Sequence, residues 1–159
     1  MKSPCLNESI NAVQQVFGNN SKAMLDWGAK NSEAMGLSKN AFNEAITPMG
    51  AMLKNLGLTG KQTSDSTLDL TQRAADMASV FNTSVPDALE AVNAGLRGES
   101  DPLERYGVHL SAAAVQTEAF SETHKTSAKA LTNQELALAR VNLIMKQTSS
   151  VRKYSEVLW

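Results

Sequence analysis

Residues able to do chemistry are few in this chain, and none of them forms a known catalytic or metal-binding pattern. The two histidines, His109 and His124, have no Cys or second His at ligand spacing. Cys5 is the only cysteine, so neither an internal disulfide nor a multi-thiolate zinc site can form. A nucleophile elbow, a glycine-rich phosphate loop and a paired-carboxylate motif are all missing. We therefore predict a protein that is not an enzyme and uses no metal or cofactor.

Two stretches imitate nucleic-acid-binding motifs. Residues 75–92 read as helix, turn and helix, but the second helix carries Asp87 and Glu90 and no Lys or Arg, so it would be repelled by DNA phosphates. The run from Gly95 to Gly98 has the spacing of the GXXG loop of a KH domain, which needs flanking strands that this sequence does not predict. We expect no specific nucleic-acid binding.

The most unusual stretch, residues 95–107, predicts a tight corner between helices. Gly98 suits the left-handed conformation that ends a helix, Ser100 suits the cap of the next one, and Pro102 suits its first turn. The charged residues here are those that caps and ion pairs use, so the corner indicates shape rather than catalysis. The predicted corner residues are Gly95, Gly98, Ser100, Pro102 and Gly107.

The elements that position this corner are predicted to be helices throughout. Aromatic residues make up 5% of the chain and runs of β-branched residues are absent, which favours an all-α fold. Gly36-Leu37-Ser38 and Gly57-Leu58-Thr59 each provide a helix end, an apolar residue and a cap. The chain thus predicts an array or bundle of about six to eight helices joined by Gly-Leu-Ser/Thr corners. No stretch approaches the ~18 apolar residues of a membrane span.

Two internal helices carry specific expectations. Pro48 lies inside the helical pattern after Ser38, and a mid-helix proline costs about 3 kcal/mol, so we expect a kink or a break near Thr47. In the helix at about 60–81, the pattern predicts five buried side chains and an exposed face that includes Arg73 and Asp76. The five predicted buried residues are Leu70, Ala74, Met77, Ala78 and Phe81.

The last helix, at about 133–149, begins with a capping box formed by Thr132 and Glu135. It is apolar over more than one face, which is typical of a helix with several neighbours or with a partner subunit. Arg140 interrupts this surface and is expected to pair with an acid of residues 63–96. The candidate interaction face consists of Leu136, Leu138, Val141, Leu143, Ile144 and Met145.

Three blocks in a fixed order resemble the conserved core of tail tape-measure proteins of long-tailed bacteriophages and prophages. They are LTQRAADMASVFNTSVPDALEAV (70–92), GLRGESDPLERYGV (95–108) and LTNQELALARVNLIMKQTS (131–149). The resemblance implies a structural protein of the virion tail, made in the host cytoplasm during assembly, which sets tail length. Its implied partners are tail tube protein, tail assembly chaperones, baseplate or initiator proteins and further copies of itself.

The resemblance also suggests how the chain is organised. Residues 1–20 form an N-terminal helix that could stand outside the core, residues 21–150 form the family-like module, and residues 151–159 do not continue the pattern. A single helix of this length would reach only on the order of 240 Å, so we expect a truncated remnant of a longer protein. The alternative is a bacterial helical adaptor that binds a partner through the face of residues 133–149.

Overall fold

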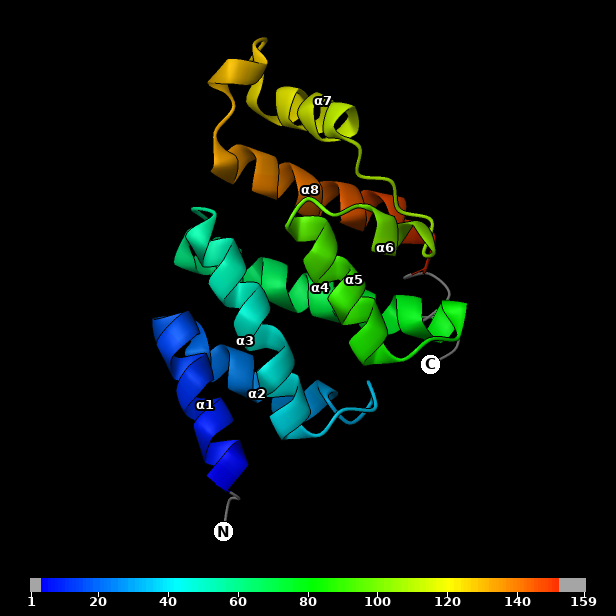
Figure 1. Cartoon of the computed structure of the whole chain (residues 1–159). Coiled ribbons are helices and arrows are strands. Elements are labelled where there is room, and N and C mark those ends of the chain that lie inside the picture. The colour runs from blue at the N-terminus through cyan, green and yellow to red at the C-terminus, as the bar shows by residue number, and fades with distance from the viewer. Residues whose placement is uncertain (1–3, 152–159) are drawn as a thin grey trace. The chain divides into compact units, whose positions relative to one another are not determined.

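The computed structural model describes residues 4–151, and every regular element in that range is a helix (Figure 1). Helices take up 78% of the described residues, which confirms the all-α prediction. The eight α-helices of this range are α1 (Pro4–Phe17), α2 (Ser21–Asn31), α3 (Lys39–Asn55), α4 (Gly60–Phe81), α5 (Val85–Leu96), α6 (Asp101–Glu104), α7 (Ala112–Thr123) and α8 (Asn133–Gln147). Two 3-10 helices, η1 (Gly18–Asn20) and η2 (Ala128–Ala130), complete the order. No helix of the described range has the length and apolar content that a membrane crossing requires.

The helices form two compact units that divide within α4, between Gln72 and Arg73. We call residues 1–72 the N-terminal unit and residues 73–159 the C-terminal unit. The sequence-based bounds at residues 20 and 150 stay a prediction. The N-terminal helix α1 packs on α3, and its Val13 and Phe17 side chains are buried. Residues 152–159, most of the predicted non-family tail, lie outside the described residues.

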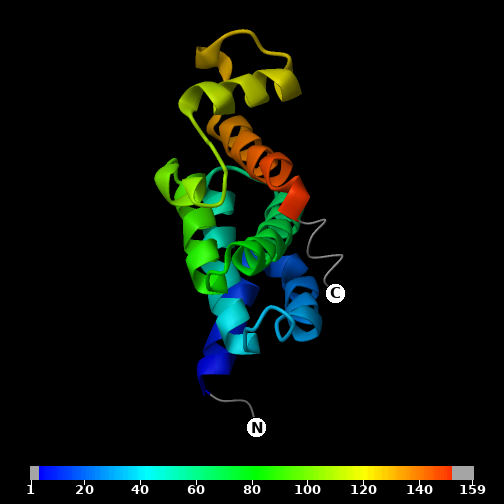
Figure 2. The ribbon, with the colours of Figure 1, turned by 90° about the vertical axis from the view of Figure 1, so that its right-hand side faces the viewer.

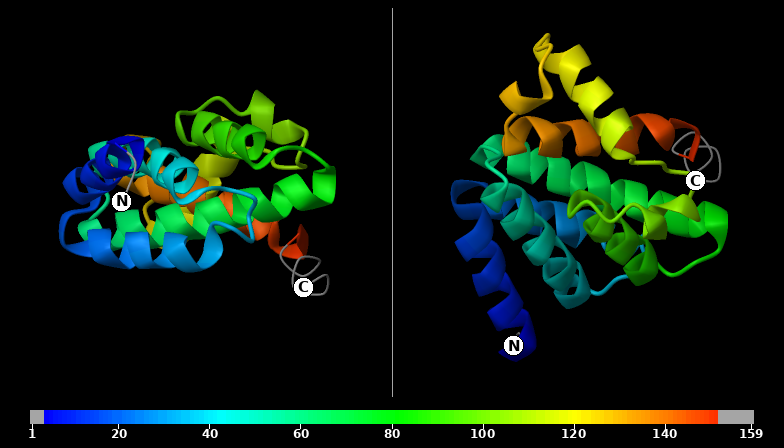
Figure 3. Two further views of the ribbon diagram at one scale, coloured as in Figure 1. Left: turned by 90° about the horizontal axis from the view of Figure 1, so that it is seen from below. Right: turned by 45° about the horizontal axis from the view of Figure 1, so that its top comes forward.

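Glycines opposite aromatic rings hold the N-terminal unit together. α1 and α3 lie side by side in Figures 1 and 3. A Cβ atom on Gly50 of α3 would lie 2.3 Å from Cζ of Phe17 on α1, and one on Gly28 of α2 would lie 2.4 Å from the Phe42 ring on α3. Trp27 stacks on Phe42 with ring centroids 5.6 Å apart. Because glycine has no side chain, the aromatic rings fill the space between these helices.

We expected a kink or a break near Thr47, and the break does not occur, because α3 runs from Lys39 to Asn55 as one helix. Pro48 is exposed, whereas Ile46 and Met49 on either side of it are fully buried. Burying such side chains stabilises a helix by about 1.5–3 kcal/mol each. Their burial offsets the about 3 kcal/mol that an internal proline costs.

The helix starts follow the predicted caps. Ser38 accepts a hydrogen bond from the Ala41 backbone N–H at 3.0 Å. Thr59 and Gln62 exchange side chain–backbone hydrogen bonds at the start of α4, and Thr132 and Glu135 do the same at the start of α8. These local hydrogen bonds fix where the corners end and the helices begin.

The C-terminal unit contains the end of α4, the tight corners around α6, and the pair α7–α8. α7 and α8 lie side by side in Figures 1 and 2. Each contributes a fully buried alanine, Ala119 and Ala137, and small side chains allow helices to approach closely. The unit thereby places the predicted corner and the predicted interaction face within one compact body.

Candidate functional site

The predicted corner closes α5 with backbone hydrogen bonds around a left-handed glycine. Gly98 has a φ of +98°, a conformation that side chain-bearing residues rarely adopt. The Glu99 N–H donates to the Ala94 carbonyl at 2.9 Å, and the Gly98 N–H donates to the Gly95 carbonyl at 3.0 Å. This pair of bonds is the Schellman arrangement, which satisfies the last carbonyls of a helix. The prediction that Gly98 ends a helix is confirmed.

The second half of the corner packs α6 onto α5. A Cβ atom on Gly95 would lie 2.3 Å from Cδ1 of the fully buried Leu103, so only glycine permits this contact unchanged. Pro102 occupies the first turn of α6, as predicted. Gly107, with a φ of +75°, ends the corner, and its N–H donates to the Glu104 carbonyl at 2.9 Å.

The predicted capping role of Ser100 is wrong. Ser100 precedes α6 with φ −82° and ψ −24°, and its side chain makes no capping hydrogen bond. A capping hydroxyl reaches the next turn from an extended backbone. Ser84 and Ser111 have that backbone, with ψ of 152° and 154°, and both of them cap. The corner bends the chain too tightly at Ser100 to leave it extended.

The structure divides the predicted interaction face of α8 between two environments. Val141 and Ile144 are buried in the C-terminal unit. The other four residues are half-buried, and they are Leu136, Leu138, Leu143 and Met145. On the same helix, Lys146 forms an ion pair with Glu118 of α7, and the Asn142 amide donates to Glu122 of α7. Apolar burial and polar bonds together fix α8 against α7.

The ion pair and the nearby carboxyl group have pKa values shifted in opposite directions. The hydrogen bond from Lys146 lowers the pKa of Glu118 below its ordinary value of 4.5. Burial is the main cause that raises the pKa of Glu122 above the same value. The Glu118 hydrogen bond raises the pKa of Lys146. Glu118 is therefore stabilised in its ionised form, whereas ionisation of the neighbouring Glu122 is less favourable.

Arg73 is a buried anchor of the C-terminal unit that sequence reasoning missed. We predicted it on an exposed face, but its side chain is 4% exposed. Its Nη1 donates to the Met145 carbonyl at 2.9 Å and to the Thr148 Oγ1 at 2.6 Å. A cation at these positions satisfies the end of α8 and complements the negative end of the helix dipole. Asp76, also predicted to be exposed, is buried as well.

Two other expectations about this region need correction. Phe81 was predicted to be buried, but it is 41% exposed and meets Tyr106 edge-on, with ring centroids 5.5 Å apart. Arg140 was expected to pair with an acid of residues 63–96, yet it forms no ion pair within the described range. Arg73 of α4, instead, forms hydrogen bonds to the end of α8.

The contacts of the two histidines described here are made by their backbone groups. The Gln147 side-chain amide accepts from the His109 N–H at 2.8 Å and donates to the His109 carbonyl at 2.9 Å. His124 ends α7 in the left-handed conformation, with a φ of +60°. Among residues 4–151, no group of three His, Cys, Asp or Glu side chains comes together in a way that could hold a metal ion.

Comparison of the chain with protein-family models, with curated proteins and with solved structures finds no match.

Proposed function

We propose that this chain is a structural module of the tape-measure type from a phage or prophage tail. The observation that supports the proposal most is how the three family-like blocks meet in the C-terminal unit. Arg73 of the first block bonds to Met145 and Thr148 of the third. Thr83 of the first block shares a hydrogen bond of 2.9 Å with Tyr106 of the second.

These contacts matter because the blocks lie far apart in the sequence. A resemblance confined to local turn signals would not require its residues to bond across the unit. Here the polar residues that join the blocks are Arg73, Thr83, Tyr106 and Thr148, and all four lie within the resembling blocks. The packing therefore brings the three blocks together within one unit, which supports a common structural role.

In this role the chain would contribute helical mass and binding surface, not chemistry. A helix rises about 1.5 Å per residue, so a long helical protein converts residue number into length during tail assembly. The partners that we propose are tail tube protein, assembly chaperones, baseplate or initiator proteins and further copies of the chain. The proposed locations are the virion tail and, during assembly, the host cytoplasm.

The proposal is tested by tube polymerisation. Reading frames beside the one that encodes this chain are searched for a tail tube protein, which is purified and followed by light scattering with and without the chain. We expect the chain to shorten the lag before tubes form, because it offers a surface on which subunits assemble. A helical protein of similar mass is the control.

Two outcomes would overturn the tail role. One is a neighbourhood without tube, baseplate or chaperone frames. The other is a lag that the chain leaves unchanged, while it forms a complex of fixed stoichiometry with a protein unrelated to tails. The second outcome would identify the chain as a helical adaptor.

A further inference from the structure

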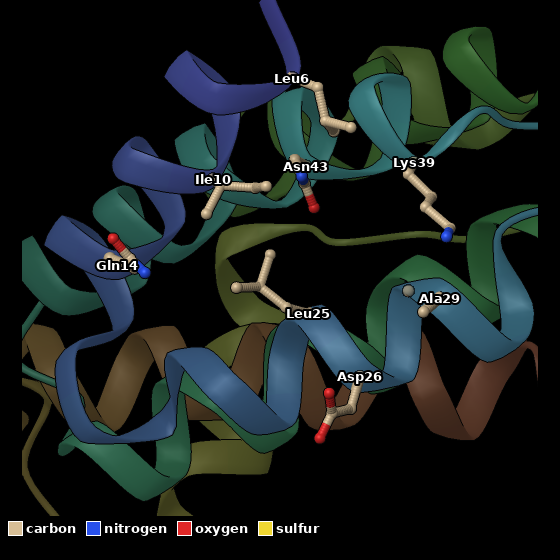
Figure 4. A pocket seen from close by; sticks show the side chains of 9 residues that line it. Leu6, Ile10, Gln14, Leu25, Asp26, Ala29, Lys39 and Asn43 are labelled. Carbon is tan, nitrogen blue, oxygen red and sulfur yellow. The ribbon is translucent and has the colours of Figure 1, made fainter. Parts of the chain in front are cut away.

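Three helices of the N-terminal unit enclose a pocket of about 470 Å³ (Figure 4). Its walls are rows of residues spaced by four, which lie on one face of each helix. α1 contributes Leu6 and Ile10, α2 contributes Leu25 and Ala29, and α3 contributes Lys39 and Asn43. The volume lies within the range of pockets for small organic molecules, about 300–1,000 Å³.

The pocket is lined by a hydrogen-bond acceptor that belongs to a buried residue, Asn43. The Asn43 side chain is 3% exposed, and its Nδ2 donates to the Ser9 hydroxyl at 3.2 Å. Its Oδ1 accepts no hydrogen bond from the described residues. Figure 4 shows this oxygen directed into the pocket, between Leu25 and Ile10. One of the two Nδ2 hydrogens is used on Ser9, and Oδ1 is the acceptor that Asn43 offers to a ligand.

The polar residues at the rim favour an anion. Asp26 is paired with Lys22 at 2.7 Å, so its charge is already balanced. Lys39, four residues before Asn43 on α3, forms no ion pair within the described range. Its exposed side chain lines the same pocket and points toward Ala29 in Figure 4. The unbalanced charge at this opening is thus positive.

We propose that this pocket binds a small organic acid with an apolar body and an N–H or O–H donor. The apolar body lies against Leu6, Ile10 and Leu25, the donor bonds to Asn43 Oδ1, and the carboxylate faces Lys39. Apolar walls with a few placed polar groups are the usual composition of small-molecule sites. The inference rests on the N-terminal unit and is independent of the proposed tail role.

The test uses indolepropionic acid, which combines a ring system, an N–H donor and a carboxylate. Binding to the full chain is measured by isothermal titration calorimetry and by shifts of backbone amide resonances. We expect resonances of α1, α2 and α3 to shift. The N-methyl derivative should bind on the order of tenfold more weakly, since it leaves Asn43 Oδ1 without its donor.

Two variants locate the site without disturbing the buried core. Ala29→Trp, at an exposed position, should fill the pocket and abolish binding. Lys39→Gln should weaken the binding of the acid and leave the binding of its neutral methyl ester unchanged. The proposal is overturned if indolepropionic acid shifts no resonance of these helices up to its solubility limit. It is also overturned if the acid and its N-methyl derivative bind equally well, or if Ala29→Trp binds like the original chain.

Discussion

The two units of this protein join their helices by different means. In the N-terminal unit, aromatic rings occupy the space left by glycines, as Phe42 does opposite Gly28 and Phe17 opposite Gly50. In the C-terminal unit, polar side chains cross between elements, as Arg73 does to the end of α8. The first kind of contact depends on shape and the second on satisfied hydrogen bonds.

The difference indicates where each unit can tolerate change. A shape-based interface responds to added volume, whereas a buried polar anchor responds to the loss of a single donor. The C-terminal unit also contains one shape-based contact, Gly95 against Leu103, within the corner. Substitutions that add volume at a glycine and substitutions that remove a buried donor, each with a matched control, therefore test this difference between the units.

The largest effect is expected for the buried polar anchor. Arg73→Met keeps an unbranched side chain but removes the donors to the Met145 carbonyl and the Thr148 hydroxyl. Leaving buried acceptors unpaired costs about 1–3 kcal/mol each, so we expect the free energy of unfolding to fall by about 3 kcal/mol. Urea unfolding followed by circular dichroism measures this change.

The matched control for Arg73 is another arginine of the same unit. Arg97 pairs with Glu90 at 3.3 Å on an exposed surface, where ion pairs contribute little. Arg97→Met should leave the urea midpoint unchanged. Equal losses for the two variants would mean that burial of Arg73 has no special role.

The next largest effect is expected for added volume in the N-terminal unit. In Gly28→Ala the new Cβ would lie 2.4 Å from the fully buried Phe42 ring, which must shift. Overpacking costs about 1–3 kcal/mol, partly offset by the helix preference of alanine, so a net loss of about 1–2 kcal/mol is expected in thermal unfolding. Gly60→Ala is the control, because its Cβ would lie 3.4 Å from the Asn20 side chain. If both variants melt together, the close approach of α2 and α3 is not needed.

A smaller effect separates a capping serine from one that does not cap. Ser111 accepts a hydrogen bond from the Ala114 N–H at 3.1 Å, whereas Ser100 makes no capping bond. Ser111→Ala should lower the free energy of unfolding by about 1 kcal/mol. Ser100→Ala should leave it unchanged, and a loss equal to that of Ser111→Ala would restore the capping role predicted from the sequence.

The smallest effect is expected in the pH dependence of the α7–α8 contact. The pKa of Glu118 is lowered, so its contribution is present above the ordinary value of 4.5 and is lost as pH falls through the lower folded value. The pKa of Glu122 is raised, so its contribution is present below 4.5 and is lost as pH rises through the higher folded value.

Each substitution should weaken one of these opposing slopes. Glu118→Gln should reduce the loss of stability on acidification below pH 4.5, to which the lowered pKa of Glu135 also contributes. Glu122→Gln should reduce the loss on the alkaline side of that value. Urea midpoints between the two folded pKa values and beyond them measure both slopes. Parallel pH profiles for the original chain and both variants would exclude a role for the two carboxyl groups.

Helix boundaries could be predicted because their signals are local. Thr59 with Gln62 and Thr132 with Glu135 form capping boxes within one turn. The capping prediction for Ser100 was wrong because the surrounding corner, rather than the residue type, sets its backbone conformation. Residue types thus predict where helices start and stop, but not how a corner bends.

The buried anchor and the pocket lay beyond sequence reasoning for other reasons. The pattern of the helix at about 60–81 placed the charged Arg73 on the exposed face together with Asp76, and no local signal indicated that it would be buried. Its acceptors lie more than seventy residues away. The pocket requires Ile10, Leu25 and Asn43 to converge from three helices, which no local pattern contains.

The most direct test of the central claim, that the C-terminal unit carries the tail-assembly role, is co-sedimentation with assembled tail tubes. The account predicts that the original chain and Gly28→Ala pellet with tubes, while Arg73→Met stays in the supernatant because the family-like blocks lose their anchor. Pelleting of Arg73→Met together with loss of Gly28→Ala would contradict the account. So would an original chain that never pellets with tubes.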